Sequence, residues 1–295
     1  MKSCIAVLTY NRLPVLQTFL RSIAQHMPNL PVAVFDDGSA DGTAEWLTAP
    51  DAEHVAEYKA RVSNNEGGAG LPPVRAFAGS NLGVAGNSNR ALRWFLTQTT
   101  CDHLLLCNDD MLATGDFAQV YATAHRRTDI GLFCWCRIGT GYETIPHVYA
   151  GTNISLLTRL TGCLMSITRK LVESIGYFDP EFGQAGEEHC AYTYRAMLAG
   201  HQNVDGIGRA GIDVDGAPAQ LQAVPSSIDA TRKPEYDAHS QGVMRAESAR
   251  YGVESPFRPY RLRPITTVGG RGSDGIPAKH VSAAFVHGDS GSFAW

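Results

Sequence analysis

Two adjacent carboxylates stand directly after an apolar run in this 295-residue sequence. Asp109 and Asp110 follow Asn108 and the apolar residues 103–107. A buried strand over 103–107 would deliver these side chains to the edge of a sheet. Carboxylate oxygens suit hard divalent cations such as Mg²⁺ and Mn²⁺, which complete their shells with substrate phosphates and water. The pair therefore suggests a metal–phosphate site, with a plain turn or helix cap as the alternative.

Two further polar runs each follow an apolar run nearer the N-terminus. They are Thr9-Tyr10-Asn11-Arg12 after residues 4–8, and Asp36-Asp37-Gly38 after residues 32–35. A carboxylate at a sheet edge, such as that of Asp37, can accept the imide N–H of uracil or thymine, or the amino and imino protons of guanine. It can therefore select a nucleotide, although a turn with helix capping accounts for the same residues.

A glycine- and asparagine-rich turn opens a helix further along the chain. It contains Asn81, Gly83, Asn89 and Arg90. The glycines let the backbone approach a ligand, and a helix N-terminus with Arg90 suits negative charge. The G-x-G-x-x-G fingerprint and the Walker P-loop are both absent from the sequence, which counts against dehydrogenase and kinase functions.

A third acidic run, Glu187-Glu188-His189, begins a predicted helix in the second half of the chain. A carboxylate at a helix start is often only a favourable interaction with the helix dipole, worth about 0.3–1 kcal/mol. The turn-forming residues Thr161-Gly162 and 176–182 would hold this helix start against a cleft, which favours a catalytic role.

Alternating elements must position these residues. Strands are predicted over 4–8, 32–35, 74–77 and 103–107, with helices through 16–27, 41–47 and 91–96 between them. Such a β-α repetition predicts an α/β fold with a mostly parallel sheet, whose ligands gather at the carboxyl ends of the strands. A strand over 160–168 and helices over 169–175 and 187–199 follow. Residues 253–295 lack periodicity and are rich in Pro, Gly and Arg, so we expect an irregular tail there.

The composition, 44% hydrophobic and 18% charged, is that of an ordinary globular protein without a predicted transmembrane segment. The N-terminus lacks the regions of a secretion signal. Seven cysteines, mostly in apolar stretches, indicate reduced thiols and a cytoplasmic location. Residues 250–295 hold six basic and three acidic residues, against a net charge of −4 for the chain. The excess of acidic residues therefore lies in the rest of the chain, which argues against binding of duplex nucleic acid as the main activity. The basic tail suits phosphate or an anionic membrane surface.

Together these motifs resemble family 2 glycosyltransferases of the GT-A fold over roughly residues 3–205. They occur in family order at 7–12, 36–39, 81–83 with Asn89, 108–110, 161–162, and 178–179 followed by 187–188. The resemblance implies one GT-A domain over 1–252, with a nucleotide-sugar-binding half (1–110) and an acceptor half (111–252), before a basic extension (253–295). It also implies a UDP-, dTDP- or GDP-linked sugar donor and inversion at the anomeric carbon.

The resemblance also implies roles for individual residues. Donor contacts are expected from Thr9, Tyr10, Asn11, Arg12, Asp37, Asn81, Gly83, Asn89 and Asp109. Mn²⁺ or Mg²⁺ is expected to bind chiefly to Asp110. Asp109 is expected to face the sugar or ribose and to contribute to the metal site. Thr161 and Gly162 are expected to contact the acceptor, and Glu188 is the implied base.

Two positions depart from the family pattern. The family places an Arg six residues after the Asp of a Glu-Asp pair, and counting back from Arg195 reaches His189. Either Glu188 is the base, or Glu188 and His189 share the role beside Glu187; a carboxylate is favoured because it stays charged at neutral pH. The metal motif begins with Asn108, which leaves two carboxylates. His239 is the candidate for the histidine that often completes the metal shell in this family, with a surface or core histidine as the alternative.

The motifs do not specify the acceptor. A glycan or lipid-linked glycan is the default, and protein, small molecule or a modified nucleic-acid base stay open.

Two other functions share part of the pattern. A nucleotidyltransferase should show a glycine-rich loop with a basic residue after Leu8, and none follows. A non-catalytic nucleotide-sugar- or glycan-binding protein would keep Asp37 and lack the base.

Overall fold

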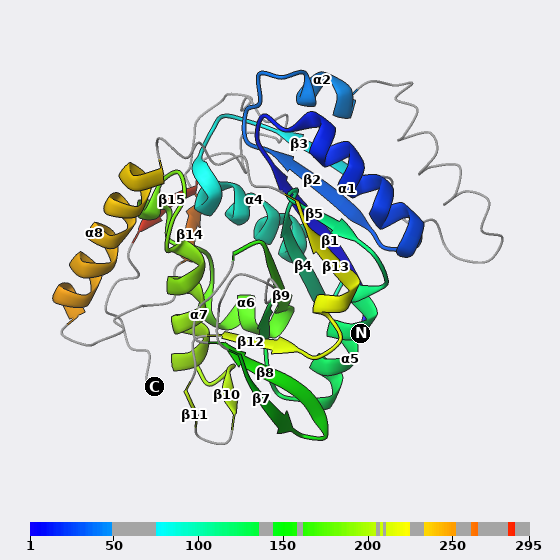
Figure 1. The fold of residues 1–295 in the computed structure, drawn as a ribbon. Coiled ribbons are helices and arrows are strands. Elements are labelled where there is room, and N and C mark those ends of the chain that lie inside the picture. Colours follow the sequence, from blue (N-terminus) through cyan, green and yellow to red (C-terminus); the bar gives the residue numbers. More distant parts are fainter. Residues whose placement is uncertain are drawn as a thin grey trace.

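Figure 1 shows the fold of the protein in a computed structural model. The structure describes residues 1–48, 75–135, 144–157, 162–204, 207–208, 211–224, 233–251, 261–264 and 283–286.

The central sheet has four neighbouring parallel strands, followed by two antiparallel pairings. In the described part of the chain its order is β3 (Arg75–Ala78), β2 (Val32–Asp36), β1 (Ser3–Thr9), β4 (His103–Asn108), β9 (Leu164–Thr168) and β6 (Leu132–Cys134). Strands β3, β2, β1 and β4 run parallel, while β9 is antiparallel to both β4 and β6. The strand order reverses between β1 and β4. In open sheets of this kind, ligands bind at the carboxyl end of such a switch point.

The register of these strands brings their polar ends to one level. Thr9 lies opposite Asp36, and Leu8 lies opposite Asn108. One further backbone hydrogen bond extends each pairing: the N–H of Asp37 donates to the carbonyl of Thr9 at 3.0 Å, and that of Asp109 donates to Leu8 at 3.1 Å. The three polar runs therefore meet at a single edge.

Helices cover both faces of the sheet (Figure 1). Helices α1 (Leu13–His26) and α5 (Phe117–Arg127) pack on one face, and α4 (Gly83–Gln98), α6 (Arg169–Ile175) and α7 (Glu188–Leu198) on the other. Strand β1 shows why the strands read as continuous apolar runs. Ile5 and Val7 enter the first hydrophobic cluster, whereas Cys4 and Ala6 enter the second, because successive side chains point to opposite faces.

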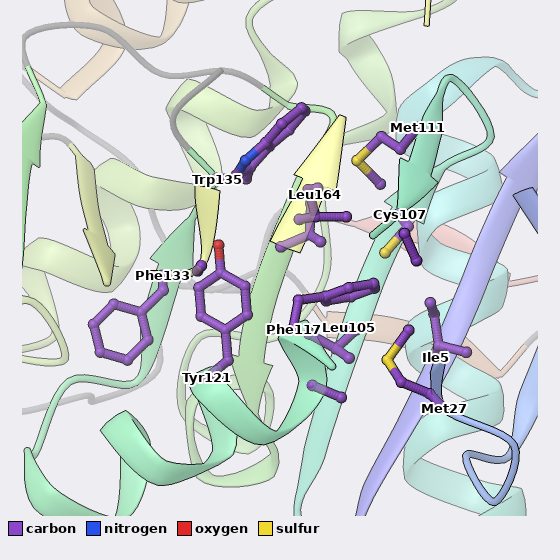
Figure 2. Packing of buried hydrophobic residues seen from close by; sticks show 14 of the residues in the cluster. Ile5, Met27, Leu105, Cys107, Met111, Phe117, Tyr121, Phe133, Trp135 and Leu164 are labelled. Atoms are coloured by element: carbon purple, nitrogen blue, oxygen red, sulfur yellow. The ribbon is translucent and has the colours of Figure 1, made fainter. Parts of the chain in front are cut away.

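The first cluster extends from the sheet to the second half of the chain (Figure 2). Phe117 and Tyr121 of α5 lie between β4 and Phe133, and all three side chains are fully buried. The buried Tyr121 hydroxyl donates a hydrogen bond to Asp213 Oδ1 at 2.8 Å. This contact fastens β12 (Gly211–Val214) to α5.

The second half adds smaller elements. A three-stranded antiparallel sheet has the order β12, β8 (Thr152–Leu157) and β7 (Thr144–Tyr149), and β5 (Met111–Ala113) pairs with β13 (Leu221–Ala223). The remaining described elements are α2 (Thr43–Thr48), the 3₁₀ helices η1 (Pro180–Phe182) and η2 (Pro218–Gln220), β10 (Asn203–Val204) with β11 (Ile207–Gly208), α8 (Lys233–Tyr251), and β14 (Arg261–Pro264) with β15 (Ala283–Val286).

The predicted α/β architecture with a mostly parallel sheet is confirmed, and the second half departs from the sequence expectation in detail. The antiparallel three-stranded sheet and α8 were not predicted. The strand expected over 160–168 begins at Leu164 in the described residues. Within the tail expected to be irregular, the described residues form one antiparallel pair, β14 with β15. None of the helices in the described ranges is long and apolar enough to cross a membrane.

Candidate active site

The centre of the site is a hydrogen-bonded cluster across the switch point between β1 and β4. Thr9 Oγ1 donates to Asp109 Oδ2 at 2.6 Å, and Arg12 Nη1 donates to Asp109 Oδ1 at 2.9 Å. The same Arg12 nitrogen lies 3.9 Å from Asp110 Oδ2. Asp109 and Asp110, here called the acidic pair, are only 2% and 6% exposed. Burial raises the pKa of Asp109 to about 6, although Arg12 and Thr9 favour its charged form.

The loop after β1 is held in an unusual backbone conformation that places Arg12. Asn11 has φ 53°, in the left-handed region that few residues other than glycine and asparagine adopt. Its N–H donates to Ser39 Oγ at 2.7 Å, and its Oδ1 accepts from the N–H of Ala40 at 2.7 Å. Asn11 therefore ties the loop after β1 to the loop after β2. Tyr10 beside it is 46% exposed.

Asp37 anchors the loop that begins α4. Its Oδ1 accepts from the N–H of Leu82 at 2.8 Å, and its Oδ2 accepts from the N–H of Gly83 at 2.9 Å. Arg90 Nη1 lies 3.5 Å from Oδ1. Burial raises the pKa of Asp37, against these stabilising contacts. Asn81 Oδ1 also accepts from Gly83 at 3.2 Å, so both predicted donor residues shape this turn.

Gly83 marks a close crossing between the two halves of the chain. Its φ is 74°, and a Cβ there would clash with the carbonyl oxygen of Gly183. The next residue, Val84, donates its N–H to the carbonyl of Gln184 at 3.0 Å. A glycine is required because the two backbones touch. The sequence motif located this turn but contained no signal for its partner.

The start of α7 brings together three of the predicted catalytic and acceptor residues. Glu187 is the N-cap, and Glu188, the first helical residue, is 5% exposed. His189 Nδ1 lies 3.4 Å from Glu188 Oε1, and a Cβ on Gly162 would lie 3.0 Å from the same nitrogen. Thr161 lies outside the described residues.

Glu188 Oε2 is buried without a hydrogen-bond partner in the described part of the protein. A buried carboxylate oxygen is normally bonded, so this atom is available to a ligand. Burial opposes the charged form of His189, but hydrogen bonds with Cys190 and Glu188 outweigh it and raise the pKa of His189 well above its usual range.

Two predicted site residues make contacts with backbone. Asn89 is bonded to Phe178 through both ends of its carboxamide, and so joins α4 to the loop before α7. His239, on α8, shares a hydrogen bond of 2.8 Å between Nε2 and the carbonyl of Glu181. Within the described ranges, no three His, Cys, Asp or Glu side chains gather as a metal-binding group, so the structure does not assemble His239 with the acidic pair. Its assignment as a ligand stays a prediction.

The acidic pair fits a divalent cation by the chemistry of its donors. Two buried carboxylates provide oxygen ligands for a hard cation, and Arg12 Nη1 lies 2.9 Å from Asp109 Oδ1 and 3.9 Å from Asp110 Oδ2. A separate cavity of about 700 Å³ lies at the opposite edge of the sheet and is lined by residues such as Ser3, Val32 and Arg75. It holds none of the predicted site residues.

Comparison with known proteins identifies the family of this chain. The description "Glycosyl transferase family 2" matches residues 4–162. A glycosyltransferase of Acanthamoeba polyphaga mimivirus is 23% identical over 208 residues, which are 67% of this chain and 73% of the relative.

Two solved structures share the fold. The mannosyltransferase PcManGT from Pyrobaculum calidifontis, in complex with GDP-Man and Mn²⁺, superposes with a TM-score of 0.51 at 19% identity, covering 77% of this chain. GalNAc-T7 with UDP, GalNAc and Mn²⁺ gives 0.54 at 13% identity, covering 78%. The chain spans 58% and 46% of these two longer chains. The sequence match extends over more than half of the chain, and the protein belongs to glycosyl transferase family 2.

Proposed function

We propose that this glycosyltransferase moves a sugar from a nucleoside diphosphate sugar to an acceptor hydroxyl, with inversion and with a divalent cation. The observation that carries the proposal is the buried cluster of Thr9, Arg12 and the acidic pair at the switch point of the sheet. The two solved structures of the same fold contain Mn²⁺ with GDP-Man or UDP, which supports the choice of ligands.

Asp110 is the principal metal ligand in this proposal, with Asp109 beside it and His239 as a further candidate. Mn²⁺ or Mg²⁺, when bound, neutralises charge on the leaving nucleoside diphosphate. Thr9 holds Asp109 in place, because its hydroxyl donates to the oxygen that Arg12 does not occupy. The chain itself contributes the two carboxylates of the acidic pair, held in place in a buried, low-dielectric environment.

The donor base lies against the loops after β1 and β2. Tyr10 offers an exposed aromatic face on which a base can stack. Asp37 already accepts two backbone hydrogen bonds, yet each carboxylate oxygen has a second lone pair for a base N–H. Asp37 therefore has two roles: it shapes the turn at Asn81–Gly83 and recognises the base.

Glu188 is the base that takes the proton of the acceptor hydroxyl. Its Oε2 is available, while its Oε1 lies 3.4 Å from His189 Nδ1. The available carboxylate oxygen supports Glu188 over its neighbour as the base. Gly162 lies close to His189, the neighbour of Glu188. Attack from the side opposite the leaving diphosphate gives inversion.

The acceptor is a glycan or lipid-linked glycan in our proposal, and the GT-A domain spans residues 1–252, with 253–295 as a C-terminal extension. The six described cysteines carry free thiols, which supports a cytoplasmic location, since reducing compartments keep thiols reduced.

A hydrolysis screen of UDP-, dTDP- and GDP-sugars with Mn²⁺ or Mg²⁺ tests the proposal without an acceptor. We expect metal-dependent release of a nucleoside diphosphate from one donor. Release of pyrophosphate from a nucleoside triphosphate and a sugar phosphate would identify a nucleotidyltransferase instead. Tight binding of a nucleotide sugar with no turnover, even with a panel of acceptors, would identify a binding protein.

A further inference from the structure

We propose that Arg12 is the internal counter-cation of the acidic pair, and that it couples the binding of the metal to the binding of the nucleoside diphosphate. This inference rests on the proposed function. It gives Arg12 a role distinct from simple contact with the donor: Arg12 holds the acidic pair in the donor-free protein and makes each of the two ligands bind better when the other is present.

The geometry shows one cation shared by two carboxylates. Arg12 Nη1 is 2.9 Å from Asp109 Oδ1 and 3.9 Å from Asp110 Oδ2, and the arginine side chain is only 9% exposed. Adjacent buried carboxylates repel each other with little screening by solvent. A guanidinium in contact with one and close to the other offsets that repulsion without a metal.

The backbone holds Arg12 at this position. Asn11 precedes it in the left-handed conformation and is bonded on one side to Ser39 and on the other to Ala40. Arg12 itself is the N-cap of α1, with φ −145° and ψ 37°. On the other side, the N–H of Leu13 donates to Asp41 Oδ2 at 2.8 Å, so hydrogen bonds hold both neighbours of Arg12.

A divalent cation on Asp110 would lie beside the guanidinium, because Arg12 Nη1 is 3.9 Å from that carboxylate. The two positive charges repel, so the metal alone binds weakly. A diphosphate brings negative charge that both cations can contact, and the repulsion is relieved. By linkage, the metal improves diphosphate binding by the same factor.

Arg12→Gln tests the inference in titration calorimetry of the full chain. Mn²⁺ is titrated into protein alone, and then into protein saturated with the diphosphate, UDP, dTDP or GDP, that corresponds to the donor. In the wild type we expect weak binding of Mn²⁺ alone and a large gain with the diphosphate. In Arg12→Gln we expect Mn²⁺ alone to bind about tenfold more tightly and the coupling factor to fall at least about fivefold.

Arg75→Gln is the matched control, because it removes one positive charge at the opposite edge of the sheet. It should leave both quantities unchanged. Arg12→Lys keeps a charge beside the acidic pair and should keep the coupling; this variant tests the inference even if Arg12→Gln fails to fold, which circular dichroism reports.

The overturning results are specific. Unchanged Mn²⁺ affinity in folded Arg12→Gln, with diphosphate affinity lowered equally with and without metal, makes Arg12 a plain donor contact. Loss of coupling in folded Arg12→Lys also overturns the inference. Failure of the proposed function gives a different result, because the wild type then binds no diphosphate in the presence of Mn²⁺. The titrations with Mn²⁺ alone still compare the Mn²⁺ affinity of the wild type with that of Arg12→Gln.

Discussion

The carboxamide of Asn89 bonds both backbone groups of Phe178: its Nδ2 donates to the Phe178 carbonyl at 2.9 Å, and its Oδ1 accepts from the Phe178 N–H at 2.8 Å. Both residues are buried. The Asn89 side chain bonds the Phe178 backbone as a neighbouring strand would. The loop that leads to α7 is therefore fixed to α4. The predicted donor role of Asn89 is therefore accompanied by a structural one.

Asn89→Ala should lower the free energy of unfolding by about 2–4 kcal/mol, because two buried backbone groups lose their partners. Chemical denaturation measures this loss. Asn153→Ala, at an exposed position of β8, is the control and should change stability by less than about 0.5 kcal/mol. Equal effects of the two substitutions would contradict a structural role for Asn89.

Asp37→Ala should weaken both the fold and donor binding. The sequence alone predicts only a loss of about 1–3 kcal/mol in donor affinity, with the fold intact. The structure adds a stability cost, since the N–H groups of Leu82 and Gly83 lose their acceptor. Thermal melts and donor titrations measure the two effects separately. An unchanged melting temperature would show that the turn at Gly83 does not depend on Asp37.

Asp110→Ala should abolish metal-dependent binding of the nucleoside diphosphate and hydrolysis of the donor, because a hard ligand is removed and phosphate repulsion is uncovered. Calorimetry with Mn²⁺ and the diphosphate checks this. Asp129→Ala, at an exposed position after α5, removes the same charge and should have no effect. Wild-type affinity in Asp110→Ala would place the metal elsewhere.

Glu188→Gln should keep donor and metal affinity and reduce transfer by about 10²–10⁴-fold, the usual effect of losing a general base. His189→Gln should cost less, since the available oxygen at this helix start belongs to Glu188. Transfer assays on these two variants and on Glu187→Gln decide the register at the start of α7. Near wild-type transfer by Glu188→Gln would move the role to a neighbour.

Two buried histidines predict how stability depends on pH. His125 Nδ1 donates to the carbonyl of Ile130, while Ser166 Oγ lies between His125 Nε2 and His103 Nε2, at 2.9 and 2.8 Å. This chain of hydrogen bonds suits two neutral rings. Burial lowers the pKa of His125 to about 4 and that of His103 well below its usual range.

The unfolded chain binds protons at these histidines below about pH 6.5, whereas folded His125 does so only near pH 4. Their contribution to stability is thus complete above about pH 6.5 and is lost as the pH falls toward 4. For His125 alone the loss is about 3 kcal/mol. Denaturation between pH 7 and 4 measures this loss. His125→Asn should weaken the dependence of the unfolding free energy on pH, and His26→Gln should leave that dependence unchanged. An identical slope in His125→Asn would exclude this pair as the cause.

The sequence predicts those features of the fold that are local. Strands β1, β2 and β4 are continuous apolar runs, and a buried parallel sheet requires such runs. Helix α6 has the predicted bounds because Gly176 ends it. Parallel strands all end at the same edge of the sheet. The sequence alone therefore predicts that the polar runs after three of these strands lie close together.

The partners of those residues could not be predicted in this way. Arg12 and Asp109 are 97 positions apart, and Asn89 and Phe178 are 89 apart, so no local pattern reports either contact. Helix α8 was missed because few apolar residues mark its inner face: Val243 and Met244 pack against Phe182 and Ala191. The available Oε2 of Glu188 likewise depends on packing around α7 that a motif does not encode.

The contact of Gly83 with the carbonyl of Gly183 limits how this enzyme can be redesigned. The turn that opens α4 and the segment before α7 touch backbone to backbone, with Val84 bonded to Gln184. The same turn transplanted from a relative would meet a foreign surface at this crossing. Chimeras that exchange residues 81–84 should therefore exchange 183–184 with them, so that the transplantable unit is a pair of segments from opposite halves of the chain.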